Sequence, residues 1–494
     1  MPDMPGDVLH SGLALFPPRD QRRAWNNHLT QALDAAEQRI AQGPVTPAFD
    51  RAAFHAELAG FDFQQPVPFA DLLGWTVVQM EHGLVHITHP RYLGLFNPAP
   101  SFPAQCADRI AASFNPQLAT ATTSPAAVAI EAHVIRAVAR RAGLPADTAG
   151  HFTTGGSEAN DTALLCALTR AAPDFAAEGS RTFAGRPVFY TSRDSHLAWI
   201  KIAHRSGIGR AAVRLVPTDG AGRMSPDALA AAIAADRREE HIPVMVVATA
   251  GTTNAGMVDP LGPCAGIARE AGAWYHVDAA WGGALVASDR LRGLLAGIEQ
   301  ADSVTIDAHK WFATTMGCGM FLTAQPQMLS AAFDVQTSYM PSHTQAVDPY
   351  VTTSQWSRRF LGLRLFLSLG TAGWAGHAAH VEQAVDRARD LAEGMRRHGW
   401  SVLNDPALAV LCLEPPSGAR PGRDIVAEVL GSGDAWVSMT RFEGRDVVRA
   451  CITHGETAPS DIAAVTALLV RAAAGQAAPC PDGRDASRRS HRPP

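Results

Sequence analysis

Short apolar runs rich in β-branched and aromatic residues alternate with helix-like segments over roughly residues 86–370 of this chain of 494 residues. Ser225-Pro226-Asp227 and Pro260 mark helix starts between these runs, and Gly272 marks a helix end. Strands that are separated by helices predict a mainly parallel sheet covered on both faces, which is an α/β fold. The runs that read as strands are Val188–Tyr190, Val213–Val216, Val244–Ala248, Trp274–Val277, Val304–Ile306 and Met320–Leu322.

Two of these runs end in charged residues. Asp278 follows the run that begins at Trp274, and the pair His309-Lys310 follows the run that begins at Ser303. Open parallel sheets bind ligands at the carboxyl ends of their strands, so both side chains are expected at one site. Pyridoxal 5'-phosphate requires a lysine amine to form an imine with its aldehyde and a carboxylate to keep its ring nitrogen protonated. Lys310 alone would be an ordinary surface charge, but with Asp278 it predicts a pyridoxal phosphate site.

A glycine-rich loop is a candidate for binding the phosphate. Gly155, Gly156 and Ser157 stand directly before a helix-like segment. Glycines let backbone N–H groups approach an anion, and the dipole of a helix N-terminus favours negative charge. Thr252 and Thr253 follow the strand-like run that ends at residue 248 and could add hydroxyl groups, although a capped turn explains them equally.

These elements, in this order, resemble the pyridoxal-phosphate-dependent group II amino-acid decarboxylases, the family of the aromatic-L-amino-acid and glutamate decarboxylases. The resemblance covers roughly residues 90–374 and implies the fold-type-I, aspartate aminotransferase-like architecture of a homodimer. In that family a Gly-Gly-Ser/Thr-Glu-Ala-Asn loop binds the phosphate, which here is residues 155–160. The resemblance further implies that His196 stacks on the cofactor ring, that Asp278 and Ala280 hold the ring nitrogen, and that His309-Lys310-Trp311 carries the imine. Without the resemblance, His196 is an ordinary histidine at a helix start.

The resemblance also implies residues that act on the substrate. Tyr339, in the polar segment that follows Phe333, matches a tyrosine that protonates the substrate Cα from a loop reaching a neighbouring subunit. Arg358 matches an arginine that pairs with the substrate carboxylate, although a surface ion pair is the alternative. Phe96 lies where aromatic decarboxylases carry aromatic residues that face the substrate. Asp307 departs from the pattern, because many members have asparagine there, and its role is left open.

The predicted activity is decarboxylation of an L-amino acid to its amine and carbon dioxide, with an aromatic amino acid as one candidate substrate. One alternative is decarboxylation coupled to oxidative deamination, which gives an aldehyde; members with that activity often replace the tyrosine or the stacking histidine, and both Tyr339 and His196 are present. A non-catalytic binding protein with the same fold is the other alternative. The substrate is not specified by these motifs.

Composition agrees with a globular enzyme. The net charge of −5 gives no general attraction to nucleic acid or to an anionic membrane, and a small amino acid is the expected partner. The seven cysteines show no Cys-x-x-Cys spacing, and the N-terminal residues lack a basic and apolar leader. A reducing cytoplasm is therefore the expected location, and no metal site is predicted.

The chain divides into four parts on this pattern. Residues 1–85 form an N-terminal helical segment, which the resemblance places against the partner subunit. Residues 86–370 form the large cofactor-binding domain, and residues 371–474 form a small α+β domain with a hairpin around Glu443-Gly444. Residues 475–494 are rich in Ala, Pro, Arg and Ser, which predicts a disordered tail.

Overall fold

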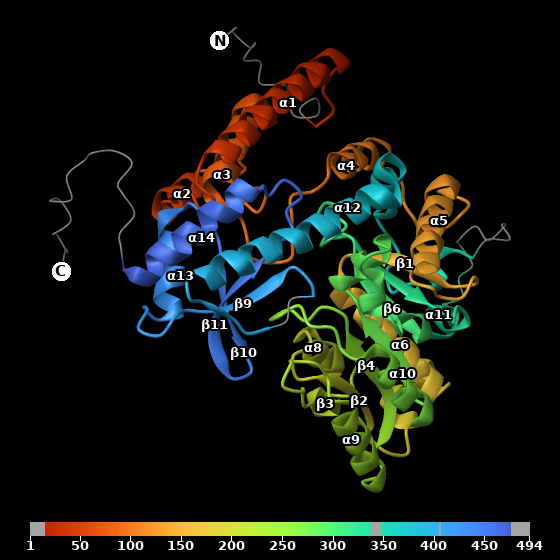
Figure 1. Cartoon of the computed structure of the whole chain (residues 1–494). Helices are drawn as coiled ribbons and strands as arrows, with labels where there is room; N and C mark the ends of the chain where they lie inside the picture. Colours follow the sequence, from red (N-terminus) through yellow and green to blue (C-terminus); the bar gives the residue numbers. More distant parts are fainter. Residues whose placement is uncertain (1–14, 336, 338–346, 405–406, 476–494) are drawn as a thin grey trace.

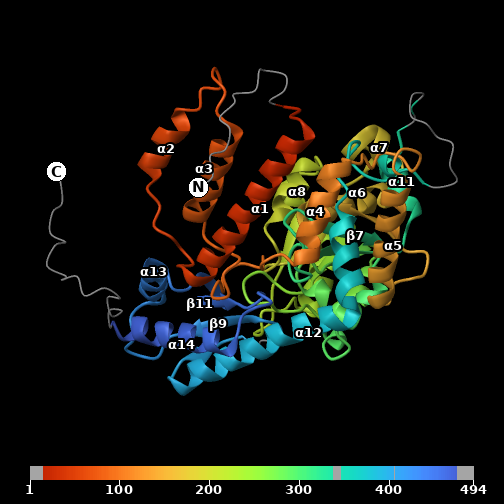
Figure 2. The ribbon, with the colours of Figure 1, turned by 90° about the horizontal axis from the view of Figure 1, so that it is seen from above.

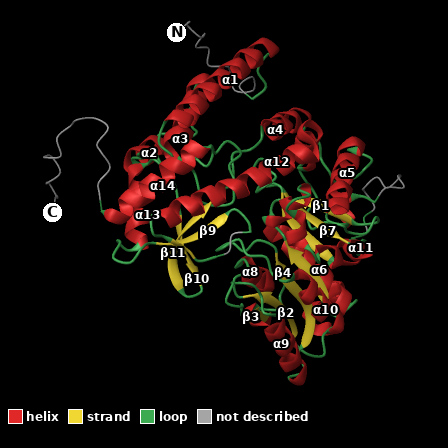
Figure 3. Cartoon of the chain, in the orientation of Figure 1, coloured by secondary structure: helices red, strands yellow, loops and turns green. Residues whose placement is uncertain are grey.

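The computed structural model of the chain describes residues 15–335, 337, 347–404 and 407–475 (Figure 1). Two sheets are visible in Figure 3, a large one surrounded by helices and a small one toward the C-terminus. Within the described residues, no helix combines the length and the apolar character that a membrane span would need.

The large sheet has seven strands in the order β1-β7-β6-β5-β4-β2-β3. Neighbouring strands are parallel from β6 to β3, whereas β7 is antiparallel to both β6 and β1. The predicted, mainly parallel α/β architecture is thereby confirmed. Its strands are β1 (Ala149–Thr153), β2 (Pro187–Ser192), β3 (Val213–Val216), β4 (Ile242–Thr249), β5 (Trp274–Asp278), β6 (Ser303–Asp307) and β7 (Gly319–Thr323).

Helices cover both faces of this sheet because its strands are apolar on both sides. Helices α6, α8 and α11 cover one face, where Phe189, Met245 and Trp274 are buried. Helices α5, α9, α10 and part of α12 cover the other, where Tyr190 and Val246 are buried. The bounds are α4 (Phe102–Phe114), α5 (Pro125–Arg141), α6 (Gly156–Ala171), α7 (Phe175–Glu178), α8 (Ala198–Arg205), α9 (Pro226–Arg238), α10 (Leu261–Glu270) and α11 (Gln327–Phe333). Short 3-10 helices lie at Gly179–Thr182, Arg210–Ala212, Gly282–Ala287, Arg292–Leu295, Ile298–Gln300 and Pro349–Val351.

Helix α12 (Gly362–Arg397) joins the large sheet to the small one (Figure 1). It packs against α4 and α5 at one end and against α14 (Pro459–Ala474) and β9 (Val410–Glu414) at the other. Gly373 interrupts its helical geometry with a φ of 63°, which a glycine adopts without strain. The predicted domain boundary after residue 370 therefore falls inside one helix, close to its kink.

The small sheet has the order β10-β11-β9-β8 and is antiparallel throughout. The predicted hairpin around Glu443-Gly444 is formed by β10 and β11. The remaining elements are β8 (Ser401–Val402), β9 (Val410–Glu414), β10 (Ser438–Phe442), β11 (Arg445–Cys451), α13 (Gly422–Ser432) and α14 (Pro459–Ala474).

The N-terminal segment consists of α1 (Arg19–Gln42), α2 (Arg51–Ala59) and α3 (Phe69–Gly83). Seen from above in Figure 2, these helices stand beside the two sheets and do not cover either of them. Several large apolar side chains of this segment are exposed, with Phe63 at 90% exposure as the extreme case.

Candidate active site

A cavity of about 300 Å³ lies at the carboxyl ends of the strands of the large sheet. Residues that directly follow β1, β2, β4, β5 and β6 all contribute to its wall, as expected for an open parallel sheet. The sequence-predicted residues in the wall are Phe96, Gly155, Gly156, Ser157, His196, Thr253, Asp278, Ala280, His309 and Lys310. Further wall residues are Thr154, Glu158, Asn160, Thr249, Gly251, Trp281 and Asp307.

Lys310 supplies the cavity's amine. Lys310 and Lys201 are the only lysines in the sequence, and Lys201 is exposed on α8, so Lys310 is the only lysine in the cavity. Its Nζ lies 3.0 Å from Oδ2 of Asp307, a residue that is 97% buried. The role of Asp307, which the sequence left open, is thus partly defined, because its carboxylate pairs with the amine of Lys310.

Asp278 faces the same cavity from the end of β5. Its Oδ1 accepts a hydrogen bond from the backbone N–H of Ala280 at 3.2 Å, and its Oδ2 accepts one from Nδ2 of Asn160 at 2.9 Å. The carboxylate is 96% buried. A buried carboxylate that is held from two sides keeps one orientation, which is what a partner for a charged ring nitrogen requires.

The N-terminus of α6 forms another part of the cavity wall. Gly155 is its N-cap, no described side chain caps the helix, and Gly155, Gly156 and Ser157 line the cavity. A Cβ added at Gly156 would lie 2.9 Å from Oδ2 of Asp307, so this close approach of loop and strand end requires glycine. Uncapped donors at a helix N-terminus fit an anion such as a phosphate.

Aromatic rings line the side of the cavity. Phe96 stacks on Trp281 at 4.4 Å between ring centroids, and Trp281 stacks on Trp311 at 4.6 Å. His196 stands at the start of α8, where its Nδ1 accepts the backbone N–H of Ala198 at 3.2 Å. The two interpretations of His196 are therefore compatible, since one ring nitrogen caps the helix while the ring lines the cavity.

The sequence analysis missed Arg449. This arginine extends from β11 of the small sheet and contacts two residues of the cavity wall, Thr253 and Phe96, without itself lining the cavity. Its Nε donates to the carbonyl oxygen of Thr253 at 3.0 Å, and its Nη1 donates to that of Gly94. Its guanidinium carbon lies 5.0 Å from the centroid of the Phe96 ring. Nη2 is buried and has no hydrogen-bond partner among the described residues. An arginine within an apolar strand such as Val447–Ile452 was the signal that could have revealed it.

Arg358 lies elsewhere. It is not among the residues that line the cavity; its Nη1 donates to Oε2 of Glu131 at 2.6 Å, and both side chains are buried. Glu131 also accepts the backbone N–H of Gly362 through its other oxygen. The ion pair compensates the buried charge of Arg358. The predicted role of Arg358 in binding the substrate carboxylate stays a prediction.

Tyr339 lies outside the residues that the structure describes, so its predicted role stays a prediction. The described residue nearest before it is Thr337.

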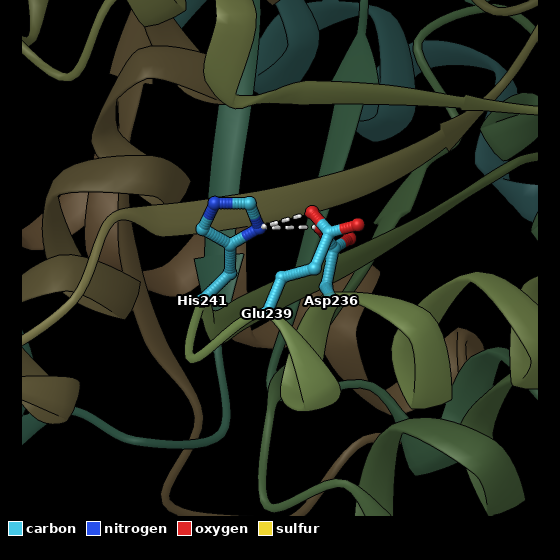
Figure 4. Close-up of side chains that lie close together, drawn as sticks. All are labelled: Asp236, Glu239 and His241. Atoms are coloured by element: carbon cyan, nitrogen blue, oxygen red, sulfur yellow. Dashed lines mark hydrogen bonds and ion pairs between the residues drawn. The ribbon is translucent and has the colours of Figure 1, made fainter.

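One other cluster has the composition of a metal site. Figure 4 shows Asp236, Glu239 and His241 pointing toward one another at the end of α9. Nε and Nη2 of Arg214, however, donate to the Asp236 carboxylate at 2.7–2.9 Å, and Tyr190 donates its hydroxyl to the same group. A guanidinium already compensates this charge and would repel a cation. The cluster therefore ties α9 to β2 and β3.

The predicted cofactor fits the residues of the cavity. The cavity contains an amine on Lys310, a fixed carboxylate on Asp278 and, at the start of α6, backbone N–H groups that no described side chain caps. These are the groups that a pyridoxal phosphate bound through its aldehyde, ring nitrogen and phosphate requires.

Comparisons with known proteins agree with this site. The family model described as "Pyridoxal-dependent decarboxylase conserved domain" matches residues 62–414. The chain is similar to an L-2,4-diaminobutyrate decarboxylase of Rhizobium meliloti, with 29% identity over 91% of this chain and 92% of the relative. It is also similar to the human cysteine sulfinic acid decarboxylase, with 33% identity over 67% of this chain and 68% of the relative. A crystal structure of Oryza sativa TDC with PLP and tryptamine shares its fold, with a TM-score of 0.87, 24% identity, and coverage of 93% of this chain and 99% of that one.

Proposed function

The chain belongs to the pyridoxal-dependent decarboxylases, a family that acts on amino acids with pyridoxal phosphate as cofactor, and from this premise we propose that it converts an L-amino acid to the corresponding amine and carbon dioxide. The observation that carries the proposal is the meeting of Lys310, Asp278, His196 and the start of α6 in one cavity, although they come from different strand ends. The alternative of a non-catalytic binding protein is disfavoured, because it would not need an amine and a fixed carboxylate in the same cavity.

The bound cofactor would supply an electron-withdrawing ring that stabilises negative charge at the substrate Cα. In our proposal the Lys310 amine holds its aldehyde carbon and the N–H groups at the start of α6 hold its phosphate. Asp278 keeps a proton on the ring nitrogen, because the carboxylate favours the charged form of a neighbouring base. His196 covers one face of the ring from the start of α8.

Arg449 is our candidate for binding the substrate carboxylate. Its Nη2 has no hydrogen-bond partner among the described residues, and its guanidinium lies over the ring of Phe96, which is a residue of the cavity wall. Guanidinium–carboxylate pairs give both affinity and orientation. The ring of Phe96 limits water on the same side, which favours loss of a charged carboxylate as neutral carbon dioxide. Arg358 retains its sequence-based role only as a prediction, because its guanidinium is paired with Glu131.

Tyr339 is proposed to deliver the proton to Cα after carbon dioxide leaves. This assignment rests on the sequence resemblance alone. The competing aldehyde-forming reaction would consume dioxygen in place of this protonation, so oxygen uptake separates the two.

We also propose that the enzyme is a homodimer. Beyond the N-terminal segment, Phe102 and Phe114 at the two ends of α4 are 74% and 82% exposed. A soluble monomer seldom leaves so many large apolar side chains in water, and a second copy of the chain is the partner that family membership favours.

The experiment that tests the proposed function is a panel of amino acids incubated with the holoenzyme and scored for release of carbon dioxide. The panel contains the twenty common amino acids together with 2,4-diaminobutyrate, cysteine sulfinate and dihydroxyphenylalanine. We expect one or a few members to release carbon dioxide and Lys310→Ala to release none. No release from any member by a holoenzyme that binds its cofactor would contradict the proposal.

A further inference from the structure

A line of buried polar side chains extends from Asp278 away from the cavity. Nδ2 of Asn160 donates to Asp278 at 2.9 Å, and Oδ1 of Asn160 lies 3.1 Å from Nε2 of His276. Nδ1 of His276 lies 2.8 Å from Oγ of Ser303, and Nε1 of Trp274 donates to the same oxygen at 2.8 Å. We call these five side chains the relay; each is at least 96% buried.

The direction of every hydrogen bond in the relay follows from its two ends. An indole N–H only donates, so the Ser303 oxygen accepts from Trp274 and has its own proton left for Nδ1 of His276. Burial lowers the pKa of His276 to about 4, against the opposing effect of Asp278, so the ring is neutral and carries its single hydrogen on Nε2. That hydrogen is directed to the Asn160 oxygen, which leaves the amide N–H groups for the carboxylate, an acceptor only.

The fold explains why these side chains meet. Alternate residues of a strand face the same side, so Trp274, His276 and Asp278 of β5 all face the side of the sheet covered by α6. Asn160 stands on the second turn of that helix, and Ser303 pairs with His276 in the neighbouring strand β6. The hydroxyl of Thr305 also lies 3.4 Å from Nε2 of His276, as a weaker second contact.

We propose that Asn160, His276 and Ser303, with Trp274 as the terminal donor, are positioning residues that act on the cofactor only through Asp278. Four hydrogen bonds aligned in one direction polarise one another and stabilise the negative charge of the carboxylate at their end. The relay thereby holds Asp278 in one orientation toward the ring nitrogen. Asn160, which the sequence resemblance assigned to the phosphate loop, acts at the nitrogen end of the cofactor.

This inference rests on the proposed role of Asp278, and its test separates the two. Apoprotein is titrated with pyridoxal 5'-phosphate and with its 1-deaza analogue, which lacks the ring nitrogen, and the ratio of the two dissociation constants is measured. Ser303→Ala should reduce the preference for the nitrogen-bearing cofactor by about three- to tenfold, because the lost link weakens a hydrogen bond to a charged group. Asp278→Asn should abolish the preference, and Ser303→Ala should then add nothing to Asp278→Asn.

Thr191→Val is the matched control, because this buried hydroxyl of the same sheet has no hydrogen-bond partner among the described residues. It should keep the wild-type preference. If Ser303→Ala weakens the binding of pyridoxal 5'-phosphate and of its 1-deaza analogue equally, or leaves the preference unchanged, the proposed role of the relay is wrong. The proposed role of Asp278 would be unaffected by that result. An unchanged preference in Asp278→Asn would instead remove Asp278 from the proposed function.

A measurement on the wild-type apoprotein covers the case in which Ser303→Ala does not fold. Nitrogen-15 shifts of labelled histidine, assigned by comparison with His276→Gln, should show His276 as the neutral Nε2–H tautomer at every pH from 5 to 9. A charged ring or the Nδ1–H tautomer in that range contradicts the relay.

Discussion

At the scale of single residues, the charged side chains in and beside the cavity each contact only a few polar groups. Lys310 pairs with Asp307 and Asp278 with Asn160, and Nη2 of Arg449 has no hydrogen-bond partner among the described residues. Because an unpaired buried charge is costly, these side chains are held close to the positions in which they would meet a cofactor and a substrate.

The lysine assignment has a direct chemical test. Borohydride reduction of the holoenzyme should fix one cofactor per chain on the peptide that contains Lys310. Lys201→Arg, which leaves Lys310 as the only lysine in the chain, should be labelled to the same extent. Lys310→Ala should lose the label and at least about a thousandfold in turnover. Peptide mass mapping checks the site, and a label on Lys201 in the wild type would refute the assignment.

The two arginines should behave differently when each is replaced. Arg449→Gln should raise KM for the amino acid about ten- to hundredfold, because a hydrogen bond to a charged group is lost. Arg358→Gln should instead lower the melting temperature, because Glu131 is left as an unpaired buried charge. Steady-state kinetics and thermal denaturation of both variants measure this. A raised KM in Arg358→Gln alone would restore the sequence-based assignment.

At the scale of elements, helices and strands carry the functional side chains to one edge of a sheet. The end of α9 is held to β2 and β3 by Asp236, to which Arg214, Tyr190 and His241 all bond. Burial opposes the charged form of Asp236, but these hydrogen bonds outweigh it and hold the pKa of Asp236 below its usual range.

This contact predicts a pH-dependent stability. Because the pKa of Asp236 is lower in the folded chain, its contribution is complete above the unfolded pKa of about 4 and is lost as the pH falls through the folded value. Asp236→Asn should therefore cost about 2 kcal/mol at pH 7, and the difference from wild type should shrink below about pH 4. Glu239→Gln, whose carboxylate is 70% exposed, should cost little. Chemical denaturation across pH measures both, and a difference that grows toward acid would contradict this prediction.

Strand positions could be predicted from sequence because their apolar runs are continuous and their ends are polar. Strand β1 was not predicted because only Phe152 and Thr153 have strand-like side chains there. Its antiparallel pairing with β7 joins residues far apart in the sequence, so it could not be read from the local pattern. The lining of the cavity by residues such as Gly156 and His309 followed from motifs. Arg449 and the relay could not be predicted in the same way, since they join positions far apart in sequence whose contact depends on the fold.

At the scale of the whole molecule, the proposed substrate site depends on both sheets. The cavity belongs to the large sheet, whereas Arg449 comes from the small one, and α12 connects the two (Figure 1). The relative placement of the two sheets therefore sets the distance between the cofactor groups and the arginine proposed to bind substrate. The sequence pattern predicted the fold class and the residues expected to bind the cofactor. It did not predict that Arg449 of the small sheet contacts residues of the cavity in the large sheet.

The proposed dimer predicts a sedimenting species of about twice 52.3 kDa. The double variant Phe102→Ser/Phe114→Ser should shift it toward the monomer, because water then solvates surface that a second copy would cover. Leu215→Ser, at an exposed position of the edge strand β3, is the matched control and should leave the mass unchanged. Analytical ultracentrifugation measures the outcome, and a wild-type monomer at micromolar concentration would contradict it.

The central claim is that this enzyme decarboxylates an amino acid and returns the amine. The most direct test is the balance of carbon dioxide, amine and dioxygen in one reaction, using the substrate found in the panel, with Lys310→Ala as the control. We predict one amine for each carbon dioxide, little oxygen uptake, and no product from the control. Oxygen consumed in proportion to carbon dioxide, with aldehyde in place of amine, would contradict the proposed reaction.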